Sequence, residues 1–367
     1  MTQNSDQQRR ADYFQRSSQL IQIDNAQLQH LFASNEAQIG WGQSQTLTIE
    51  GNKFFVKRIP MTDLEFNNMF STKNLYDLPT YYNYGVGSAG FGIFRELVAH
   101  VKTTNWVLNG EIATFPLLYH YRVIPFSGEC IEVDPEEHER YVTYWGGNEK
   151  IGQYLLDKRN ANYELVLFLE YIPHVLEHWL MDHCEQIDDV LEQLRLSIHF
   201  LGKRDVIHFD ANFDNILTDG ERVYLTDFGL VLDREFALSD TEKAFFAAHT
   251  SYDYGLVLAN LMNPLHELCQ LLPESEQQQL REQFGAFDAE NQFRNLIMAV
   301  VENLEEIGTD GPLHIHPTYL ACLLRYRRVG LLMQKFRLDL RENNQKDTPF
   351  PHAEIQRLLV EANFWAD

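Results

Sequence analysis

Cysteine is scarce in this sequence of 367 residues, which has four, at positions 130, 184, 269 and 322. They lie far apart and form no C-x-x-C pair, so the chain lacks the spacing of a disulfide framework or a zinc-binding knuckle. Long apolar runs are also missing, and the polar residues 1–20 contain no signal-peptide core. We therefore expect a cytoplasmic protein without a membrane-spanning helix.

Basic residues are few as well. The chain has 30 lysines and arginines against 53 aspartates and glutamates, which gives a formal net charge of −23. A surface with this charge repels nucleic-acid phosphates and anionic lipids, so we expect neither nucleic acid nor a membrane as a partner. Hydrophobic residues make up 44% of the chain, as in ordinary globular proteins, and the length is sufficient for two lobes with separate cores.

The predicted elements divide the chain into three parts of different character. These are a flexible tail (1–15), a β-rich lobe with one helix (16–172) and a mostly helical lobe (173–367). Strands are predicted in the β-rich lobe at 45–50, 53–59, 113–124 and 163–172, and a helix at 91–108. Gly51-Asn52 is a two-residue hairpin signal between the first two strands. Less regular insertions are expected at about 60–92 and 126–160. The fold class is therefore α+β.

The helical lobe begins with an amphipathic pattern over residues 187–203, which predicts a helix with Gly202 as its C-cap. Two short strands joined by Asp219-Gly220 follow within residues 215–229. Beyond about residue 252 the pattern is helical almost to the end of the chain.

One stretch, residues 206–233, has a spacing that suggests chemistry. It contains His208-Phe209-Asp210, then Asn215, then Asp227-Phe228-Gly229 after the predicted hairpin. This order of residues resembles the catalytic core of the protein-kinase superfamily. The resemblance implies phosphoryl transfer, which needs a carboxylate beside the attacking hydroxyl and oxygen ligands that hold magnesium against the phosphates. It implies that an extended loop places Asp210 at the nucleophile and Asn215 at a metal ion, and that the hairpin returns Asp227 to the same place.

This pattern, H-x-D-x-x-x-x-N followed by D-F-G, resembles the protein-kinase-like superfamily in an atypical, bacterial, eukaryotic-like form. The resemblance covers roughly residues 35–265 and implies a two-lobed fold that binds Mg-ATP. It implies that Asp210 is catalytic and that Asn215 and Asp227 bind the metal. It also implies a strand lysine that holds the α- and β-phosphates, Lys57, paired with a helix glutamate, Glu96.

By the same resemblance, Gly40 and Gly42 would cover the phosphates, although Gln45 stands where a third glycine is usual. The segment "LFLEYIP" resembles the hinge between kinase lobes, so the backbones of Glu170 and Ile172 would bind adenine.

A second glycine motif, "GVGSAGFG" at Gly85–Gly92, follows Lys57 instead of preceding it. It therefore cannot be the kinase glycine-rich loop, and the preceding segment is a poor strand for a dinucleotide-binding motif. Two interpretations remain open: a plain linker to the helix that carries Glu96, or a second flap whose amides lie near the cleft.

Several departures from the family pattern bear on the acceptor. Phe209 replaces an arginine, Asn212 stands where a lysine or histidine is usual, and no A-P-E motif follows the D-F-G. We expect an ATP-dependent kinase that acts on a hydroxyl of protein Ser/Thr, with ATP and Mg²⁺ as cofactors. The alternatives are a small-molecule kinase of the antibiotic- or sugar-phosphorylating type and a nucleotide-binding pseudokinase scaffold.

Overall fold

In a computed structural model, the protein is described over residues 2–33, 38–39, 42–126, 134–284, 297–304 and 313–365. The chain forms two compact units, the first built from residues 1–173, 208–210 and 224–245, and the second from 174–207, 211–223 and 246–367. The first crossing between units follows Pro173. Helices and small antiparallel sheets occur together, so the class is α+β, as the sequence predicts.

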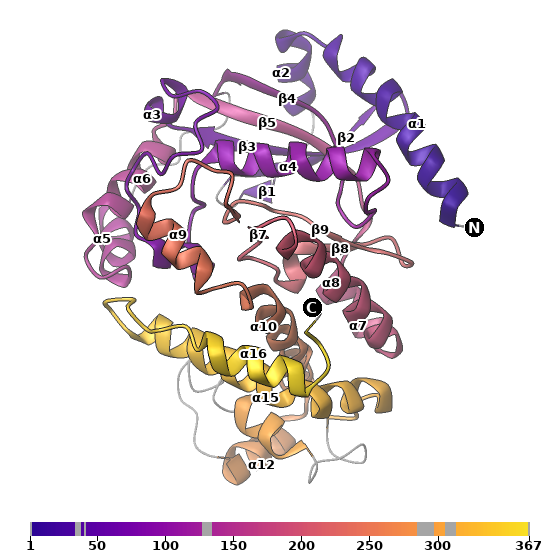
Figure 1. Ribbon diagram of the computed structural model, residues 1–367, viewed down its shortest axis with the longest axis vertical. Helices are drawn as coiled ribbons and strands as arrows, with labels where there is room; N and C mark the ends of the chain where they lie inside the picture. Colours follow the sequence, from indigo (N-terminus) through magenta and orange to yellow (C-terminus); the bar gives the residue numbers. More distant parts are fainter. Residues whose placement is uncertain are drawn as a thin grey trace. The chain divides into compact units, whose positions relative to one another are not determined.

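The core of the first unit is a five-stranded antiparallel sheet of order β1-β2-β3-β5-β4. Its strands are β1 (Gln38–Ile39), β2 (Gln43–Ile49), β3 (Asn52–Met61), β4 (Leu118–Pro125) and β5 (Tyr163–Glu170). Helix α4 (Ile93–Leu108) lies along one face of the sheet (Figure 1), where Phe94 and Leu97 pack with Ile59 and Leu167. The register pairs Lys57 with Leu167. Because side chains alternate along a strand, Lys57 shares the α4 face with Phe55 and Ile59, as predicted.

The β2–β3 hairpin is confirmed, with its turn one residue earlier than expected. Ile49 pairs with Asn52, so the turn residues are Glu50 and Gly51. Both have positive φ, at 48° and 82°, which is the conformation of the tight turns that match strand twist. The sequence therefore predicted correctly that Gly51 lies in the turn, but it placed Gly51 first in the turn, whereas it is second.

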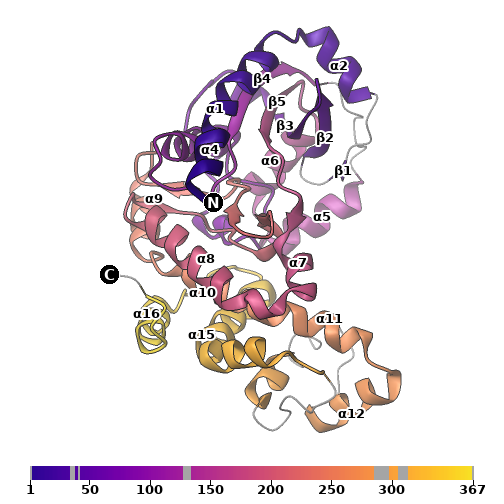
Figure 2. The same cartoon turned by 90° about the vertical axis from the view of Figure 1, so that its right-hand side faces the viewer.

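The predicted flexible tail at residues 1–15 is wrong, because the structure has a helix there, α1 (Thr2–Ile21). Arg9 donates to both carboxylate oxygens of Glu170 and to the carbonyls of Ala113 and Phe115. Figure 2 shows α1 beside β4. The polar composition hid this helix, since its anchors are charged groups about a hundred or more residues away in sequence.

The other elements of the first unit include the two helices of the 126–160 insertion. They are α2 (Asn25–Ala33), α3 (Asp63–Phe66), η1 (Thr80–Tyr84), α5 (Pro135–Tyr144), α6 (Glu149–Arg159), β9 (Val223–Leu225), β10 (Leu232–Asp233) and the start of α9 (Asp240–Ala247). The irregular pattern of this insertion predicted neither α5 nor α6.

The second unit is mainly helical. Its elements are β6 (His174–Val175), α7 (Leu176–Asp182), η2 (Cys184–Gln186), α8 (Ile187–Gly202), β7 (Val206–Ile207), η3 (Phe213–Asn215), β8 (Ile216–Thr218), α10 (Tyr252–Ala259), η4 (Asn260–Met262), α11 (Asn263–Leu271), α12 (Glu274–Phe284), α15 (Pro317–Glu342) and α16 (His352–Glu361). Helix α15 packs against α10 and α16 (Figure 1). The helix predicted at 187–203 is present, but Gly202 is its last helical residue and Lys203 is the C-cap.

Two further predictions about composition can be compared with the structure. Cys184, Cys269 and Cys322 are free thiols, and Cys130 lies outside the described residues. Within the described part of the chain, every helix is too short or too polar to span a bilayer.

The sheet also contains a buried ion pair that should be costly to break. Arg58 donates to Glu164 through Nε at 3.0 Å and Nη2 at 2.8 Å, and both side chains are at most 5% exposed. Glu164→Leu removes the carboxylate from a buried guanidinium, so the free energy of unfolding should fall by about 3–5 kcal/mol. Urea denaturation measures this change.

The matched control for this variant is Asp77→Asn, which removes one charge from the exposed pair that Asp77 forms with Lys150. That change should alter the unfolding free energy by no more than about 0.5 kcal/mol. If both substitutions changed the unfolding free energy equally, the Arg58–Glu164 contact would not be the buried ion pair described above.

Candidate functional site

Three of the predicted site residues meet in the first unit. The Nζ atom of Lys57 on β3 lies 2.7 Å from Oε1 of Glu96 on α4 and 2.8 Å from Oδ1 of Asp227. The side chains of Lys57 and Glu96 are 20% and 6% exposed, whereas that of Asp227 is 39% exposed. The ammonium therefore links the sheet, the helix and the D-F-G segment, with one carboxylate open to solvent.

The charges within this group stabilise one another. Burial opposes the charge of Lys57, but the carboxylates of Asp227 and Glu96 outweigh it and raise the pKa of Lys57. Burial likewise acts against Asp227, yet the nearby ammonium lowers the pKa of Asp227 to about 2. Burial raises the pKa of Glu96, and Lys57 opposes this. At neutral pH the ammonium and the Asp227 carboxylate are both charged.

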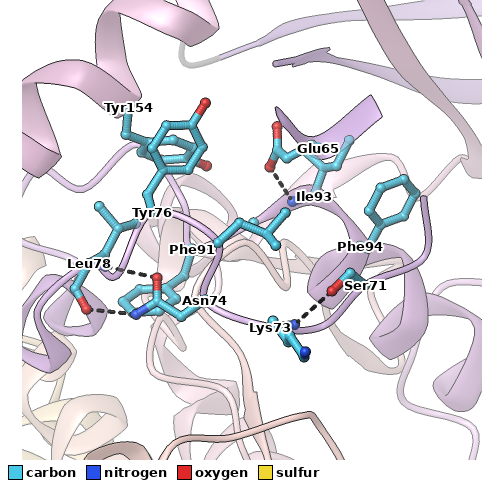
Figure 3. Close-up of a pocket in the computed structure, with 12 residues that line it drawn as sticks. Glu65, Ser71, Lys73, Asn74, Tyr76, Leu78, Phe91, Ile93, Phe94 and Tyr154 are labelled. Atoms are coloured by element: carbon cyan, nitrogen blue, oxygen red, sulfur yellow. Dashed lines mark hydrogen bonds between the residues drawn. The ribbon is translucent and has the colours of Figure 1, made fainter. Parts of the chain in front are cut away.

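Glu96 is positioned by an unusual helix start. The N-cap of α4 is Gly92, which has no side chain to cap the helix. Glu65 of α3 replaces it, because its Oε1 accepts the N–H of Ile93 at 3.1 Å (Figure 3). This contact fixes the first turn of α4, in which Glu96 lies.

Figure 3 also shows a pocket at this end of α4, lined by residues between 65 and 78, by residues 91–94 and by Tyr154. Its polar groups are largely paired with one another. Asn74 exchanges hydrogen bonds with the backbone of Leu78, and the N–H of Lys73 donates to Ser71 Oγ at 3.3 Å. These bonds hold the 71–78 segment, so we assign the pocket a role in supporting α4.

The D-F-G segment adopts a strained but well-anchored conformation. Asp227 has φ of 59°, in the left-handed region, and its Oδ1 accepts the N–H of Gly229 at 3.3 Å. Phe228 is fully buried, with its ring centroid 4.9 Å from those of both His100 and His208. This packing fixes the backbone next to Asp227.

Asp210 is oriented by the histidine two residues before it. The N–H of Asp210 donates to Nδ1 of His208 at 3.2 Å, and Nε2 of His208 lies 3.0 Å from the carbonyl of Thr226. Burial lowers the pKa of His208 to about 4, so the ring is neutral, with Nδ1 as acceptor and Nε2 as donor. The imidazole thus joins the backbone of Asp210 to that of the D-F-G segment.

The segment after Gly229 is anchored by permanent contacts. Arg95 of α4 pairs with Glu242 at 2.6 Å, and both side chains are at most 3% exposed. Lys102 of α4 binds Asp233 at 2.6 Å, also with a largely buried carboxylate. Phe209 stacks on Phe245 with ring centroids 5.4 Å apart. Ionic and aromatic contacts therefore both hold this segment.

The second glycine motif lies at the same place. A Cβ on Gly85 would come within 2.7 Å of Oδ1 of Asp210, and the φ of Gly85 is +60°. The N–H of Phe91 donates to the carbonyl of Gly229 at 2.8 Å. The segment therefore contacts both the predicted catalytic carboxylate and the D-F-G glycine.

The glycines predicted to cover the phosphates are less informative. Gly40 lies outside the described residues. Gly42 packs closely on β3, where a Cβ would be 2.5 Å from the carbonyl oxygen of Arg58. This contact explains the glycine by packing, and its contact with phosphate stays a prediction.

The predicted adenine-binding backbone also has a defined environment. The N–H of Glu170 donates to the carbonyl of Leu117 at 2.8 Å, so this donor is occupied. The N–H of Ile172 has no acceptor among the described residues. Ile172 therefore offers a donor next to the end of β5, and adenine binding there stays a prediction.

Asn215 belongs to the second unit, at the end of η3, where its N–H donates to the carbonyl of Asn212 at 2.9 Å. Its shared metal site with Asp227 stays a prediction. The chemistry of Asp227 suits magnesium, because it is a charged, half-exposed carboxylate whose Oδ2 forms no hydrogen bond with a described residue. No group of three or more metal-ligating side chains occurs among the described residues. Magnesium commonly binds through one or two carboxylates and substrate phosphates.

Sequence reasoning missed Lys158 of α6, which is buried near this site. Its ammonium donates to the carbonyl of Ala89 at 2.7 Å. A signal did exist, since Lys158 falls at helical spacing on the stripe formed by Ile151, Tyr154 and Leu155, which is otherwise buried and uncharged.

The neutral, buried His100 gives a pH prediction. Burial and the charge of Lys57 lower its pKa to about 3, whereas an unfolded histidine titrates near its ordinary 6.5. The unfolded chain therefore binds a proton that the folded protein does not, and stability falls as the pH drops below 6.5. Between pH 7.5 and pH 5, the free energy of unfolding of His100→Leu should therefore fall by about 1–2 kcal/mol less than that of the wild type.

Urea unfolding at the two pH values measures this difference. His208 is present in both proteins, so its contribution to the pH dependence of stability cancels in the comparison. Both ring nitrogens of His100 lack hydrogen-bond partners, so the substitution leaves no orphaned group. Equal losses in both proteins would show that His100 is charged in the fold.

Comparison with known proteins identifies no relatives. No family model matches the sequence, and no curated protein gives a significant match. The chemistry of this site is therefore argued from the residues of this chain alone.

Proposed function

We propose that this protein is an ATP-dependent phosphotransferase with a two-lobed, protein-kinase-like fold. The observation that carries the proposal is the contact of Lys57 with both Glu96 and Asp227. The sequence predicted the pairing of Lys57 with Glu96 and, separately, the presence of Asp227 in the site. A buried ammonium held by two carboxylates is a costly arrangement for stability alone. In phosphoryl transfer it has a purpose, since the ammonium neutralises phosphate charge and the helix glutamate positions it.

In the reaction, Asp210 orients the acceptor hydroxyl and accepts its proton as the hydroxyl oxygen bonds to the γ-phosphorus. The bond between that phosphorus and the leaving oxygen of ADP breaks at the same time. His208 supports this role because it accepts the Asp210 N–H. Lys57 would hold the α- and β-phosphates. Magnesium, when bound, offsets the negative charge of the phosphates, and Asp227 and Asn215 are the residues that would hold it.

The acceptor we favour is the hydroxyl of a protein Ser or Thr. The segment after Gly229 supports this choice, because the buried pair between Arg95 and Glu242 holds it in place, as a segment that docks a protein substrate requires. A small-molecule acceptor is the second candidate. The backbone of Gly85 against Asp210 favours it, since that contact narrows the approach to the carboxylate. The pseudokinase scaffold is the third, and the intact carboxylates argue against it.

Phosphate transfer can be tested directly with Asp210→Asn. The purified protein is incubated with Mg-ATP labelled at the γ-phosphate and a lysate of its source organism. Loss of the general base should reduce transfer by roughly 10²- to 10⁴-fold while ATP still binds. Asp240→Asn is the control, because the Asp240 side chain is 99% exposed, and it should behave as the wild type.

The location of the label identifies the acceptor. Label in protein bands supports a protein kinase, and label only in the soluble fraction supports a small-molecule kinase. ATP binding with no transfer by either protein would favour the scaffold, and equal transfer by both would remove Asp210 from the mechanism.

A further inference from the structure

The carbonyls of the glycine segment, Gly85–Gly92, are held by the insertion helices. Side chains of α5 and α6 donate to three of its carbonyls. These bonds are Tyr144 to Val86 at 2.6 Å, Tyr141 to Gly87 at 3.0 Å, and Lys158 to Ala89 at 2.7 Å. Because three carbonyls are fixed toward the insertion helices, the peptide groups of the segment have defined orientations.

The amides of the same segment are largely unused. Among the described residues, the N–H groups of Val86, Gly87, Ser88 and Gly90 have no hydrogen-bond acceptor. Val86 and Ser88 are at most 8% exposed, and Gly87 and Gly90 have φ of 109° and 96°. Successive backbone N–H groups in such conformations form concave sites that bind anions.

Two buried side chains give an independent indication of an anion. Lys158 is 6% exposed and has no carboxylate within ion-pair distance in the described part of the chain. The hydroxyl of Tyr154 is buried and has no hydrogen-bond partner among the residues that the structure describes. A Cβ on Gly90 would lie 3.9 Å from the Lys158 ammonium and 4.0 Å from the Tyr154 hydroxyl. Burial lowers the pKa of Lys158, and the carboxylates of Glu65 and Glu96 oppose this only from beyond ion-pair distance. A buried cation without a direct partner is costly unless a ligand supplies one.

The position of the segment indicates which anion it would bind. Gly85 contacts the Asp210 carboxylate, and a Cβ on Gly90 would lie 3.5 Å from the Gly229 carbonyl. These are the residues expected at the transferred phosphate, whereas Ile172 is expected at adenine. The segment is therefore placed for the terminal phosphates of a nucleotide.

We propose that Gly85–Gly92 is a second phosphate-binding loop, which binds the terminal phosphates of ATP through its backbone amides. Lys158 is a positioning residue that orients the loop and supplies positive charge, and Tyr154 supplies a further donor. This inference rests on the proposed kinase function for the identity of the nucleotide. It assigns the insertion helices α5 and α6 to the phosphate site.

Lys158→Met tests the proposal, with Lys150→Met as the control. Lys150 lies on the same helix but is exposed and pairs with Asp77. Calorimetry measures binding of Mg-ATP, adenosine and pyrophosphate to the full-length proteins. Lys158→Met should lower the affinity for ATP and for pyrophosphate at least tenfold, which is the effect expected when a charged hydrogen bond is lost. It should change adenosine affinity less than twofold, and Lys150→Met should change all three less than twofold.

If Lys158→Met lowered the affinities for ATP and adenosine equally, Lys158 would have only a structural role. If its affinity for pyrophosphate were unchanged, the loop would be excluded as a phosphate site. Tyr154→Phe covers the case in which Lys158→Met does not fold, because it breaks no hydrogen bond. Tyr154→Phe should lower the affinity for pyrophosphate about two- to fivefold. An affinity equal to that of the wild type would overturn the proposal.

Failure of the kinase function gives a different pattern. A wild-type protein that binds neither ATP nor adenosine would overturn the proposed function. Pyrophosphate binding would then show on its own whether the loop binds phosphate, since pyrophosphate needs no adenine site.

Discussion

The contact of one ammonium group with two carboxylates organises the first unit. Lys57 reaches Glu96 and Asp227 from the middle of the sheet, so the sheet, α4 and the D-F-G segment must all be in register for it to form. The supporting contacts follow from this need. Glu65 caps α4, and Phe228 packs beside His100 and His208.

The sequence predicted the parts of this arrangement that depend on local pattern. Strand alternation placed Lys57 on the α4 face, helical spacing placed Glu96, and the hairpin between β2 and β3 was one residue out of register. The contact between Lys57 and Asp227, 170 positions apart, could be anticipated only from the combined motifs.

Long-range contacts explain what local pattern could not predict. Helix α1 was taken for a tail because Arg9 finds Glu170 only in the folded chain. The glycine segment could not be placed, since its neighbours Tyr141, Tyr144 and Lys158 lie in an insertion with little periodicity. Polar residues anchored by distant partners look like solvent-exposed residues in a sequence.

The aromatic residue at position 209 has a consequence for the stability of the segment after Gly229. Phe209 stacks on Phe245, and Arg95 pairs with Glu242, so aromatic and ionic contacts both hold this segment. Displacing the segment would separate the two rings and leave a buried guanidinium without its carboxylate, which costs free energy. The position of the segment is therefore maintained by contacts within the chain.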